Sequence, residues 1–249
     1  TILHAPTLNN LSFNGANTVV LIEGTTTLVQ VTASTTDYNG YADMISATST
    51  FYRYPAQGPM CTANDNNCYQ IATTSCTFSA CSGTDCSLTC SAKMQYFTDP
   101  TDSTAFPGQH WYARMSVVDS TSLYGTATSS SIDVGTLRGL SIDLGNITFS
   151  SSTPGGVGVG DYSTTTKTTA TNTGNSPIDL GIYGTALTNG VGGIIGTSSQ
   201  KFATSTFNYA SCALCGVLSG VATNANVNIS KPTSTSTPSQ HDVYWGISI

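Results

Sequence analysis

The chain has 249 residues, of which 39% are hydrophobic and only 8% are charged, and its formal net charge is −6. Seven scattered Lys and Arg residues against 13 acidic ones exclude the basic patch with which nucleic-acid-binding proteins neutralise phosphates. No apolar run approaches the roughly 18 residues that a membrane span needs. A surface rich in Thr and Ser but poor in charge is unlike that of most cytosolic proteins, so we expect an extracellular or cell-surface protein.

Along the first part of the chain, apolar residues alternate with polar ones at a period of two, which predicts short β-strands separated by turns. The expected strands are residues 18–22, 27–33, 45–54, 74–80, 87–96, 110–119 and 126–134. Residues 82–85 would form the tip of a hairpin between the fourth and fifth of them. Short strands at regular spacing are typical of a β-sandwich with Greek-key connections. We therefore expect a first domain over residues 1–135, in which a short segment, residues 1–8, precedes the first strand.

The second part, residues 136–249, follows the same pattern with more Gly, Ser and Pro between the strands. The expected strands are residues 140–149, 163–172, 178–183, 217–222, 227–230 and 243–249. Residues 151–160 and 231–240 are expected to be loops, and no helical periodicity extends beyond a turn or two. At roughly 100–150 residues per domain the length also fits two domains. The predicted fold class is all-β, with two tandem sandwiches.

The eight cysteines are even in number and closely spaced, which is typical of disulfides formed in an oxidising compartment. The hairpin over residues 74–96 has two cysteines at its base and two beside its tip, which favours nested pairing. The expected pairs are Cys76–Cys90 and Cys81–Cys86 in this hairpin, Cys61–Cys68 in a small polar loop and Cys212–Cys215 in a loop of the second domain. Zinc is the alternative, although only residues 212–215 form a CxxC pair.

The sequence offers little for catalysis. It has no G-x-S-x-G elbow and no H-E-x-x-H motif, and Glu23 is its only glutamate. His4, His110 and His241 fall near a terminus, a strand start and a loop end, where surface histidines are common. We therefore expect that the chain is not an enzyme.

Calcium is the one cofactor for which the residues provide a case. Asp37, Asn39 and Asp43 place oxygen ligands at positions i, i+2 and i+6 around a glycine turn, and calcium prefers several oxygens on such a loop. Other carboxylates could approach it from the same end of the sandwich, namely Asp99, Asp102 and Asp119. Asx turns account for the same residues without a metal.

Aromatic residues gather in the first domain, where they would either stack on carbohydrate or fill the core. They are Tyr38, Tyr41, Tyr52, Tyr54, Trp111 and Tyr112. A tryptophan on a central strand is usually a core anchor of a sandwich. We expect core positions for Trp111 and for Trp245 in the second domain.

The chain also carries a family resemblance. The segments YNGYADMISATSTFYR (38–53), CTANDNNCYQI (61–71) and HWYARMSVVDS (110–120) resemble the Ig-like repeats of large bacterial surface proteins. The segments IDLGNIT (142–148), ATNTGNSPIDLGIYGTAL (170–187) and VYWGISI (243–249) resemble another extracellular Ig-like module. The resemblance covers most of the chain and implies a cell-surface or filament protein. It transfers no catalytic residue.

The resemblance also implies one more strand after residue 249. A sandwich without its last strand exposes an open edge and an apolar groove, which a neighbouring subunit can fill with a donated strand. The donor would be residues 1–8, through Ile2, Leu3 and Leu8, and the acceptor would be the strand of Val243, Trp245, Ile247 and Ile249. Such a head-to-tail contact builds a filament. Alternatively, the second domain is completed internally or the chain continues.

Three functions remain open at this point. The leading hypothesis is a structural subunit of an extracellular, pilus-like filament or of a surface layer, with itself as its partner. The alternative is a surface adhesin or glycan-binding module. An accessory domain pair of an enzyme is the third.

Overall fold

The computed structural model describes residues 2–143, 146–147, 149, 161–188 and 190–248, and for residues 161–166 it describes the backbone alone. The chain is all-β, as predicted. The helices among the described residues are four single-turn 3-10 helices: η1 (Asn14–Ala16), η2 (Tyr41–Asp43), η3 (Thr73–Ser75) and η4 (Thr197–Ser199). Within the described residues no helix is long and apolar enough to cross a membrane.

The chain divides into two compact units. Unit 1 comprises Thr1–Leu137 and Gly174–Ser176, and unit 2 comprises Arg138–Thr173 and Pro177–Ile249. The short stretch 174–176 thus packs with unit 1 although it follows the first strands of unit 2 in sequence.

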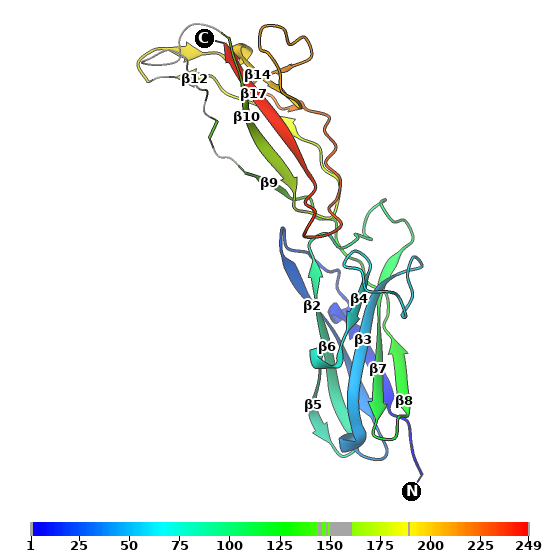
Figure 1. Cartoon of the computed structure of the whole chain (residues 1–249). Helices are drawn as coiled ribbons and strands as arrows, with labels where there is room; N and C mark the ends of the chain where they lie inside the picture. The colour runs from blue at the N-terminus through cyan, green and yellow to red at the C-terminus, as the bar shows by residue number, and fades with distance from the viewer. Residues whose placement is uncertain (1, 144–145, 148, 150–160, 189, 249) are drawn as a thin grey trace. The chain divides into compact units, whose positions relative to one another are not determined.

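Unit 1 consists of two four-stranded antiparallel sheets (Figure 1). The first sheet has the order β1 (Thr7–Phe13), β2 (Thr26–Thr36), β6 (Asp85–Gln95) and β5 (Cys76–Ser82). The second has the order β4 (Cys68–Ile71), β3 (Met44–Tyr54), β7 (His110–Asp119) and β8 (Tyr124–Thr128). Strands β2, β3, β5, β6 and β7 agree with the expected ranges to within a few residues. Strands β1 and β4 were not expected, and β8 is shorter than the expected 126–134.

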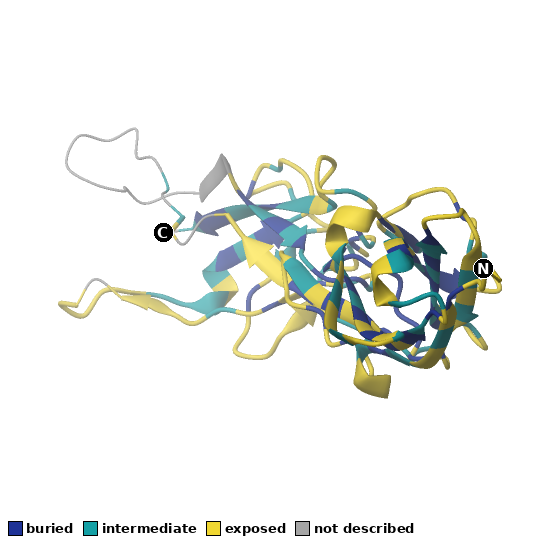
Figure 2. Cartoon of the chain, turned by 90° about the horizontal axis from the view of Figure 1, so that it is seen from below, coloured by how far each residue is buried: buried dark blue, intermediate teal, exposed yellow. Residues whose placement is uncertain are grey.

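The core of unit 1 lies between these two sheets. Strand β7 shows why: its residues at 111, 113, 115 and 117 are all buried, whereas the residues between them are half-buried. Phe13 of the first sheet and Phe51 of the second contact each other with ring centroids 4.6 Å apart. Trp111 is completely buried, as expected, and its indole N–H donates to the backbone oxygen of Asp99 at 3.0 Å. Figure 2 shows the same alternation of buried and exposed residues along the strands.

The N-terminal segment differs from the prediction. Residues 7–13 form strand β1, in which Leu8 pairs with Thr35 of β2, so Leu8 belongs to the sheet of its own unit. The alternation is hidden because a bulge shifts the register between Asn9 and Ser12; a bulge adds one residue to one strand and reverses the faces beyond it. Residues 18–22 form no strand, and only Val19 makes an isolated bridge.

Pro6 marks the point at which the chain enters unit 1. It is buried, and its carbonyl oxygen lies only 1.9 Å from the position that a Cβ on Gly125 would occupy. Glycine is therefore required at position 125 for this close approach. The described residues before Pro6, namely 2–5, are all exposed.

Unit 2 contains one five-stranded antiparallel sheet and two small strand pairs. The sheet has the order β15 (Gly216–Val217), β14 (Gln200–Ala203), β17 (Gln240–Ser248), β10 (Asp161–Asn172) and β9 (Leu140–Ile142). The pairs are β11 (Gly181–Ile182) with β16 (Thr223–Asn224) and β12 (Leu187–Thr188) with β13 (Ile194–Ile195). Strand β14 was not predicted, and β9 is shorter than the expected 140–149. Residues 151–160, the expected loop, lie outside the described part of the chain.

The core of unit 2 is small, because most of its strands contribute only one or two inward residues. Its buried hydrophobic residues are Ala170, Leu180, Ile182, Phe202, Leu218, Ile229 and Val243. Phe202 lies flat against the neighbouring strand, where a Cβ on Gly216 would be 2.3 Å from its ring. The unpredicted strand β14 therefore depends on a glycine across the sheet, which no local pattern reveals.

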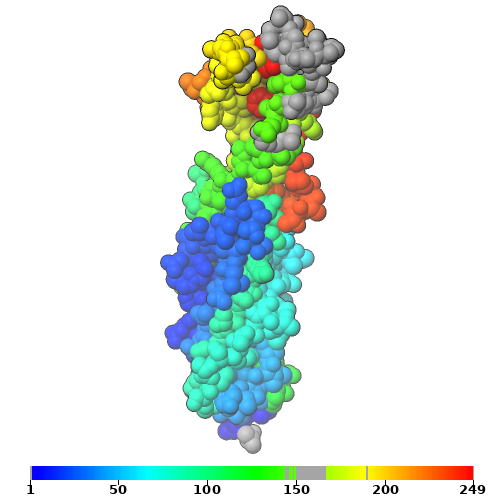
Figure 3. Space-filling view, turned by 90° about the vertical axis from the view of Figure 1, so that its left-hand side faces the viewer, coloured from blue at the N-terminus to red at the C-terminus, as the bar shows by residue number. Residues whose placement is uncertain are grey.

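The eight cysteines form four disulfides: Cys61–Cys68, Cys76–Cys90, Cys81–Cys86 and Cys212–Cys215. All four are the expected pairs, two from the nested hairpin and two from short loops. Strands β5 and β6 form the hairpin with Cys76 directly opposite Cys90, and the cyan-to-teal atoms of this region lie on the face of unit 1 seen in Figure 3. Every described cysteine is bonded, so none remains for zinc.

In unit 2, the Asp179 carboxylate binds the backbone of the loop around Val227. Its Oδ1 accepts hydrogen bonds from the backbone N–H groups of Leu180 (3.0 Å) and Val227 (2.9 Å), next to Asn226 and Asn228, which have positive φ angles. Hydrogen bonds, first from the Asn224 side chain and then from Val227, lower the pKa of Asp179. A lowered folded-state pKa stabilises the fold above the ordinary aspartate value, and that stabilisation is lost as the pH falls through the folded pKa.

We therefore expect Asp179→Asn to remove part of the acid sensitivity of unit 2. At about pH 6 the wild type should unfold at a higher temperature than the variant, because charge-assisted hydrogen bonds are the stronger ones. Below about pH 3 the two should converge, because the wild-type carboxyl is then protonated. Thermal unfolding followed by circular dichroism across this pH range measures the effect. A constant difference at every pH would contradict it.

Candidate metal centre

Three aspartates of unit 1, two from the turn between β2 and β3 and one from the end of β7, meet at one end of its two sheets. Asp37 follows β2, Asp43 ends η2 directly before β3, and Asp119 is the last residue of β7. One carboxylate oxygen from each lies within 4.8 Å of the other two. Asp37 and Asp119 are buried, at 0% and 1% exposure, and Asp43 is half-buried.

The backbone explains why these residues converge. In the register of β3 and β7, Met44 pairs with Asp119, which brings the residue before Met44 beside the end of β7. The turn after β2 is closed by hydrogen bonds from Gly40 N to Asp37 O (2.9 Å) and from Asp43 N to Gly40 O (3.0 Å). Gly40 has a φ of 111°, a conformation that residues with a Cβ rarely adopt.

In each of the two buried carboxylates, only one of the two oxygens accepts hydrogen bonds. Asp37 Oδ1 accepts from Asn39 N at 2.8 Å. Asp119 Oδ1 accepts from the backbone N–H groups of Thr121 and Leu123, each at 2.8 Å. The Oδ2 atoms of both aspartates are buried and have no hydrogen-bond partner. Ser120 Oγ donates to Asp43 Oδ1.

No described cation compensates this charge. The ion pairs of the described residues are Arg53–Asp99, His110–Asp133 and Lys167–Asp242, and none of them includes a member of the cluster. A buried carboxylate oxygen without a partner is costly, and neighbouring like charges add to the cost. The cluster is therefore a candidate cation site in which each of the three aspartates offers an oxygen ligand.

The structure reassigns several of the predicted ligands. Asn39 is adjacent to the cluster, but its side chain binds the N-terminal segment: Nδ2 donates to Ile2 O (2.9 Å) and Oδ1 accepts from His4 N (2.7 Å). Asp99 does not approach the site, because it pairs with Arg53 at the other end of β3. Asp102 instead accepts hydrogen bonds from Thr136 N and Oγ1. Of the three additional candidates, only Asp119 joins Asp37 and Asp43.

The residues predicted for assembly fall into different environments. Ile2 and Leu3 are exposed, at 77% and 56%, whereas Leu8 packs against the core of unit 1. Val243 and Ile247 are buried in unit 2, and the half-buried Trp245 donates its indole N–H to Thr168 Oγ1 at 3.0 Å. Ile249 and the strand expected after it lie outside the described residues.

If the second unit lacked a last strand next to β17, that strand would lie at an edge of its sheet. Strand β17 instead lies inside the sheet. It pairs with β10 on one side and with β14 on the other, so the edge strands of the sheet are β9 and β15. The reason is that β14, which local pattern does not reveal, covers the second side of β17.

An incomplete edge is present on the other side of β10. Strand β9 pairs only with Ala170–Asn172 of β10, and no other described strand pairs with β10 on that side; Figure 1 shows β9 beside one end of the longer β10. An apolar groove of about 370 Å³ lies next to this edge. Its lining includes Leu140, Ile142, Ala170, Leu180, Val243 and Trp245.

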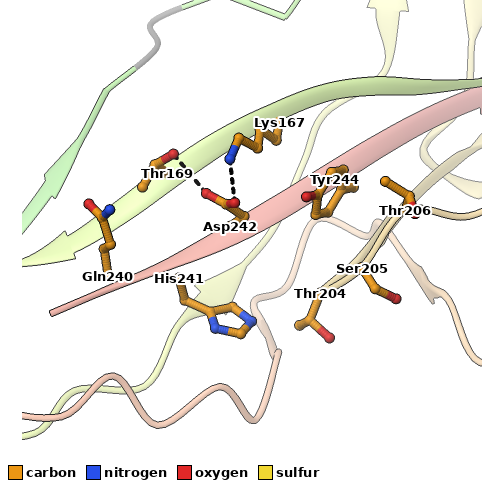
Figure 4. A pocket seen from close by; sticks show the side chains of 9 residues that line it. All are labelled: Lys167, Thr169, Thr204, Ser205, Thr206, Gln240, His241, Asp242 and Tyr244. Atoms are coloured by element: carbon orange, nitrogen blue, oxygen red, sulfur yellow. Dashed lines mark hydrogen bonds and ion pairs between the residues drawn. The ribbon is translucent and has the colours of Figure 1, made fainter.

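A second pocket of unit 2 is polar and lies over β10 and β17 (Figure 4). Lys167 Nζ and Asp242 Oδ2 are 2.5 Å apart, and Thr169 Oγ1 donates to Asp242 Oδ1 at 2.8 Å. The lysine lowers the pKa of Asp242, and the aspartate raises the pKa of Lys167. The two charges therefore neutralise each other and leave neither group as a general acid or base near neutral pH.

The aromatic residues of unit 1 do not form a broad exposed face. Trp111 and Tyr52 are buried. Tyr112 is half-buried, with Tyr52 stacked at 6.0 Å between ring centroids and Tyr54 edge-on at 5.9 Å. Tyr54 is exposed, and so are Tyr38 and Tyr41, which lie in the turn before β3, whereas Tyr54 is at the opposite end of that strand.

Comparisons with known proteins add little to these observations. No protein-family model and no curated protein matches the sequence. Among solved structures, the chain is similar to a DUF4466 family protein from Parabacteroides merdae, with 9% sequence identity, full coverage of both chains and a TM-score of 0.30. A likeness at this level carries no argument about fold or function. The chain itself is all-β with four disulfides, which is typical of secreted or extracellular proteins.

Proposed function

We propose that this chain is a structural subunit of an extracellular filament or surface layer, in which copies join head to tail through a donated strand. The observation that carries the proposal is the edge of β10 that no strand of the described residues covers beyond β9, next to the apolar groove of unit 2. An unpaired strand edge next to an apolar groove is the arrangement that accepts an added strand, because backbone hydrogen bonds give affinity and the groove accommodates alternate side chains.

The strand order of unit 1 supports an Ig-like fold for that unit. From edge to edge, one sheet has the strand order β1, β2, β6 and β5, and the other has the order β4, β3, β7 and β8. This order corresponds to the A-B-E-D and C′-C-F-G arrangement of immunoglobulin-type sandwiches. Ig-like modules are common in extracellular proteins, which agrees with the disulfides.

We assign the donated segment to the residues before Pro6 in a neighbouring copy. Asn39 holds this segment by its backbone, through Ile2 O and His4 N, and the Ile2 and Leu3 side chains are exposed. Two large aliphatic side chains fit a groove of about 370 Å³. Burying them would contribute about 1.5–3 kcal/mol each, which favours assembly at high local concentration.

Two variants test this contact from its two sides. Ile2→Asp/Leu3→Asp removes the donor, and Ile142→Asp places a charge in the acceptor groove at a residue that is already 48% exposed. The wild type is expected to form concentration-dependent polymers in sedimentation velocity and electron microscopy, and each variant is expected to stay monomeric. Val221→Asp is the matched control, because Val221 is exposed in unit 2 but does not line the groove.

Mixing the two variants provides the sharpest test. Each retains one intact half of a head-to-tail contact, so the mixture should form one-to-one dimers that cannot grow. The proposal fails if the wild type remains monomeric at every concentration, as a second unit completed internally requires. It also fails if the donor variant polymerises like the wild type.

A further inference from the structure

We propose that Asp37, Asp43 and Asp119 bind one calcium ion. This inference is independent of assembly, because the site lies wholly within unit 1. It rests on two observations: the convergence of three carboxylates within 4.8 Å, and the buried, unpartnered Oδ2 atoms of Asp37 and Asp119.

The spacing of the oxygens fits a shared cation. Calcium binds oxygen at about 2.3–2.6 Å, so two of its ligands are at most about 5 Å apart. All three carboxylates satisfy this limit. The loop N–H groups bind the Oδ1 atoms of Asp37 and Asp119 and thereby leave each Oδ2 as the free ligand. Second-shell hydrogen bonds of this kind orient metal ligands.

The chemistry of the ligands selects the metal. The cluster offers oxygen alone, whereas zinc in proteins favours Cys and His. Magnesium demands near-ideal octahedral geometry and releases its water reluctantly, while calcium accepts six to eight oxygens in an irregular arrangement. Two carboxylates from the turn between β2 and β3 and one from the end of β7 suit the less demanding ion, with water and backbone carbonyls as the further ligands.

The site also joins the two sheets of unit 1. Asp37 follows β2 of the first sheet, whereas Asp43 and Asp119 belong to the ends of β3 and β7 of the second. A bound ion would therefore tie the sheets together at this end and remove the repulsion among the three charges. Calcium-binding extracellular modules commonly have dissociation constants of about 10⁻⁴–10⁻³ M, and we expect a value in or below this range.

The experiment is a titration of the EDTA-treated full chain with CaCl₂, and separately with MgCl₂, by isothermal calorimetry and thermal unfolding. We expect one calcium site and a rise in melting temperature of roughly 5–10 °C at 100 times the dissociation constant. Magnesium should bind at least about tenfold more weakly. Asp119→Asn should weaken calcium binding by at least about tenfold, because it removes a charged ligand. The half-buried Asp43→Asn provides a second variant with the same expectation.

Stability without metal separates a ligand role from a purely structural one. In EDTA, Asp119→Asn should be at least as stable as the wild type, because its Oδ1 keeps the loop hydrogen bonds and its amide can donate to the unpartnered oxygen of Asp37. In calcium the order should reverse. A purely structural role predicts the same loss in both buffers. Asp102→Asn, whose carboxyl faces Thr136, is the matched control and should bind calcium like the wild type.

Absence of calcium binding by the wild type would overturn the proposal. Equal affinity for magnesium would overturn the assignment to calcium. An Asp119→Asn variant that binds calcium like the wild type would overturn the ligand set. The monomeric Ile2→Asp/Leu3→Asp variant should bind calcium normally, so that failure of the assembly proposal and failure of this one can be distinguished.

Discussion

Asp99→Ala is expected to destabilise unit 1 by about 3–5 kcal/mol, because it removes one partner of a buried ion pair. Arg53 Nη2 lies 3.0 Å from Asp99 Oδ2, and both side chains are less than a tenth exposed. The guanidinium also donates to Gln109 Oε1 and lies 3.8 Å over the Phe106 ring. Without the carboxylate, this charge would remain buried and uncompensated. The loss is large beside the 5–15 kcal/mol by which most domains are stable.

The double variant Arg53→Met/Asp99→Leu is the matched control. Replacing both partners of a buried pair by apolar residues of similar volume is often neutral or stabilising, so the double variant should be markedly more stable than the single one. Urea unfolding in a Trp245→Phe background measures both, because Trp111 then reports unit 1 alone. A loss below about 1 kcal/mol for Asp99→Ala would show that the pair behaves as an exposed one.

Removal of the Cys76–Cys90 disulfide by alanine substitution is expected to cost unit 1 about 3 kcal/mol, the value for a closed loop of about 15 residues. The two cysteines face each other across β5 and β6, and Cys90 is completely buried. Without this bond, the outer strand β5 is joined to β6 by its ladder and by the Cys81–Cys86 disulfide near the hairpin tip. The same fluorescence assay should therefore show a lower urea midpoint for unit 1.

The Cys212–Cys215 bond is the control for this prediction. It closes a loop with a sequence separation of only 3 in unit 2. Its removal should leave the Trp111 transition of unit 1 unchanged. If both double variants lower that midpoint equally, the effect reflects a general consequence of losing a disulfide and not the hairpin of β5 and β6.

The alternation of apolar and polar residues was sufficient to predict a strand wherever the strand is long and has one buried face. Strand β7 was predicted to the residue, because every second side chain from Trp111 to Val117 faces the core. The disulfides of the hairpin followed in the same way, since opposite positions in a hairpin are fixed by its turn. Pattern failed at β1, where a bulge interrupts the alternation, and at β14, where burial of Phe202 depends on a distant glycine.

The candidate metal centre likewise contains residues that local sequence predicts to be close together and one residue that it does not. Asp37 and Asp43 are separated by one turn, so their proximity was evident from the amino-acid order alone. Asp119 reaches them only because β7 pairs with β3 in a particular register, and the same pairing carries Arg53 to Asp99 at the other end. The order of residues thus predicted the all-β class, the cysteine pairs and two of the three aspartates of the candidate site. Long-range strand pairing selected the third, because carboxylates far apart in the chain meet only after the sheets have formed.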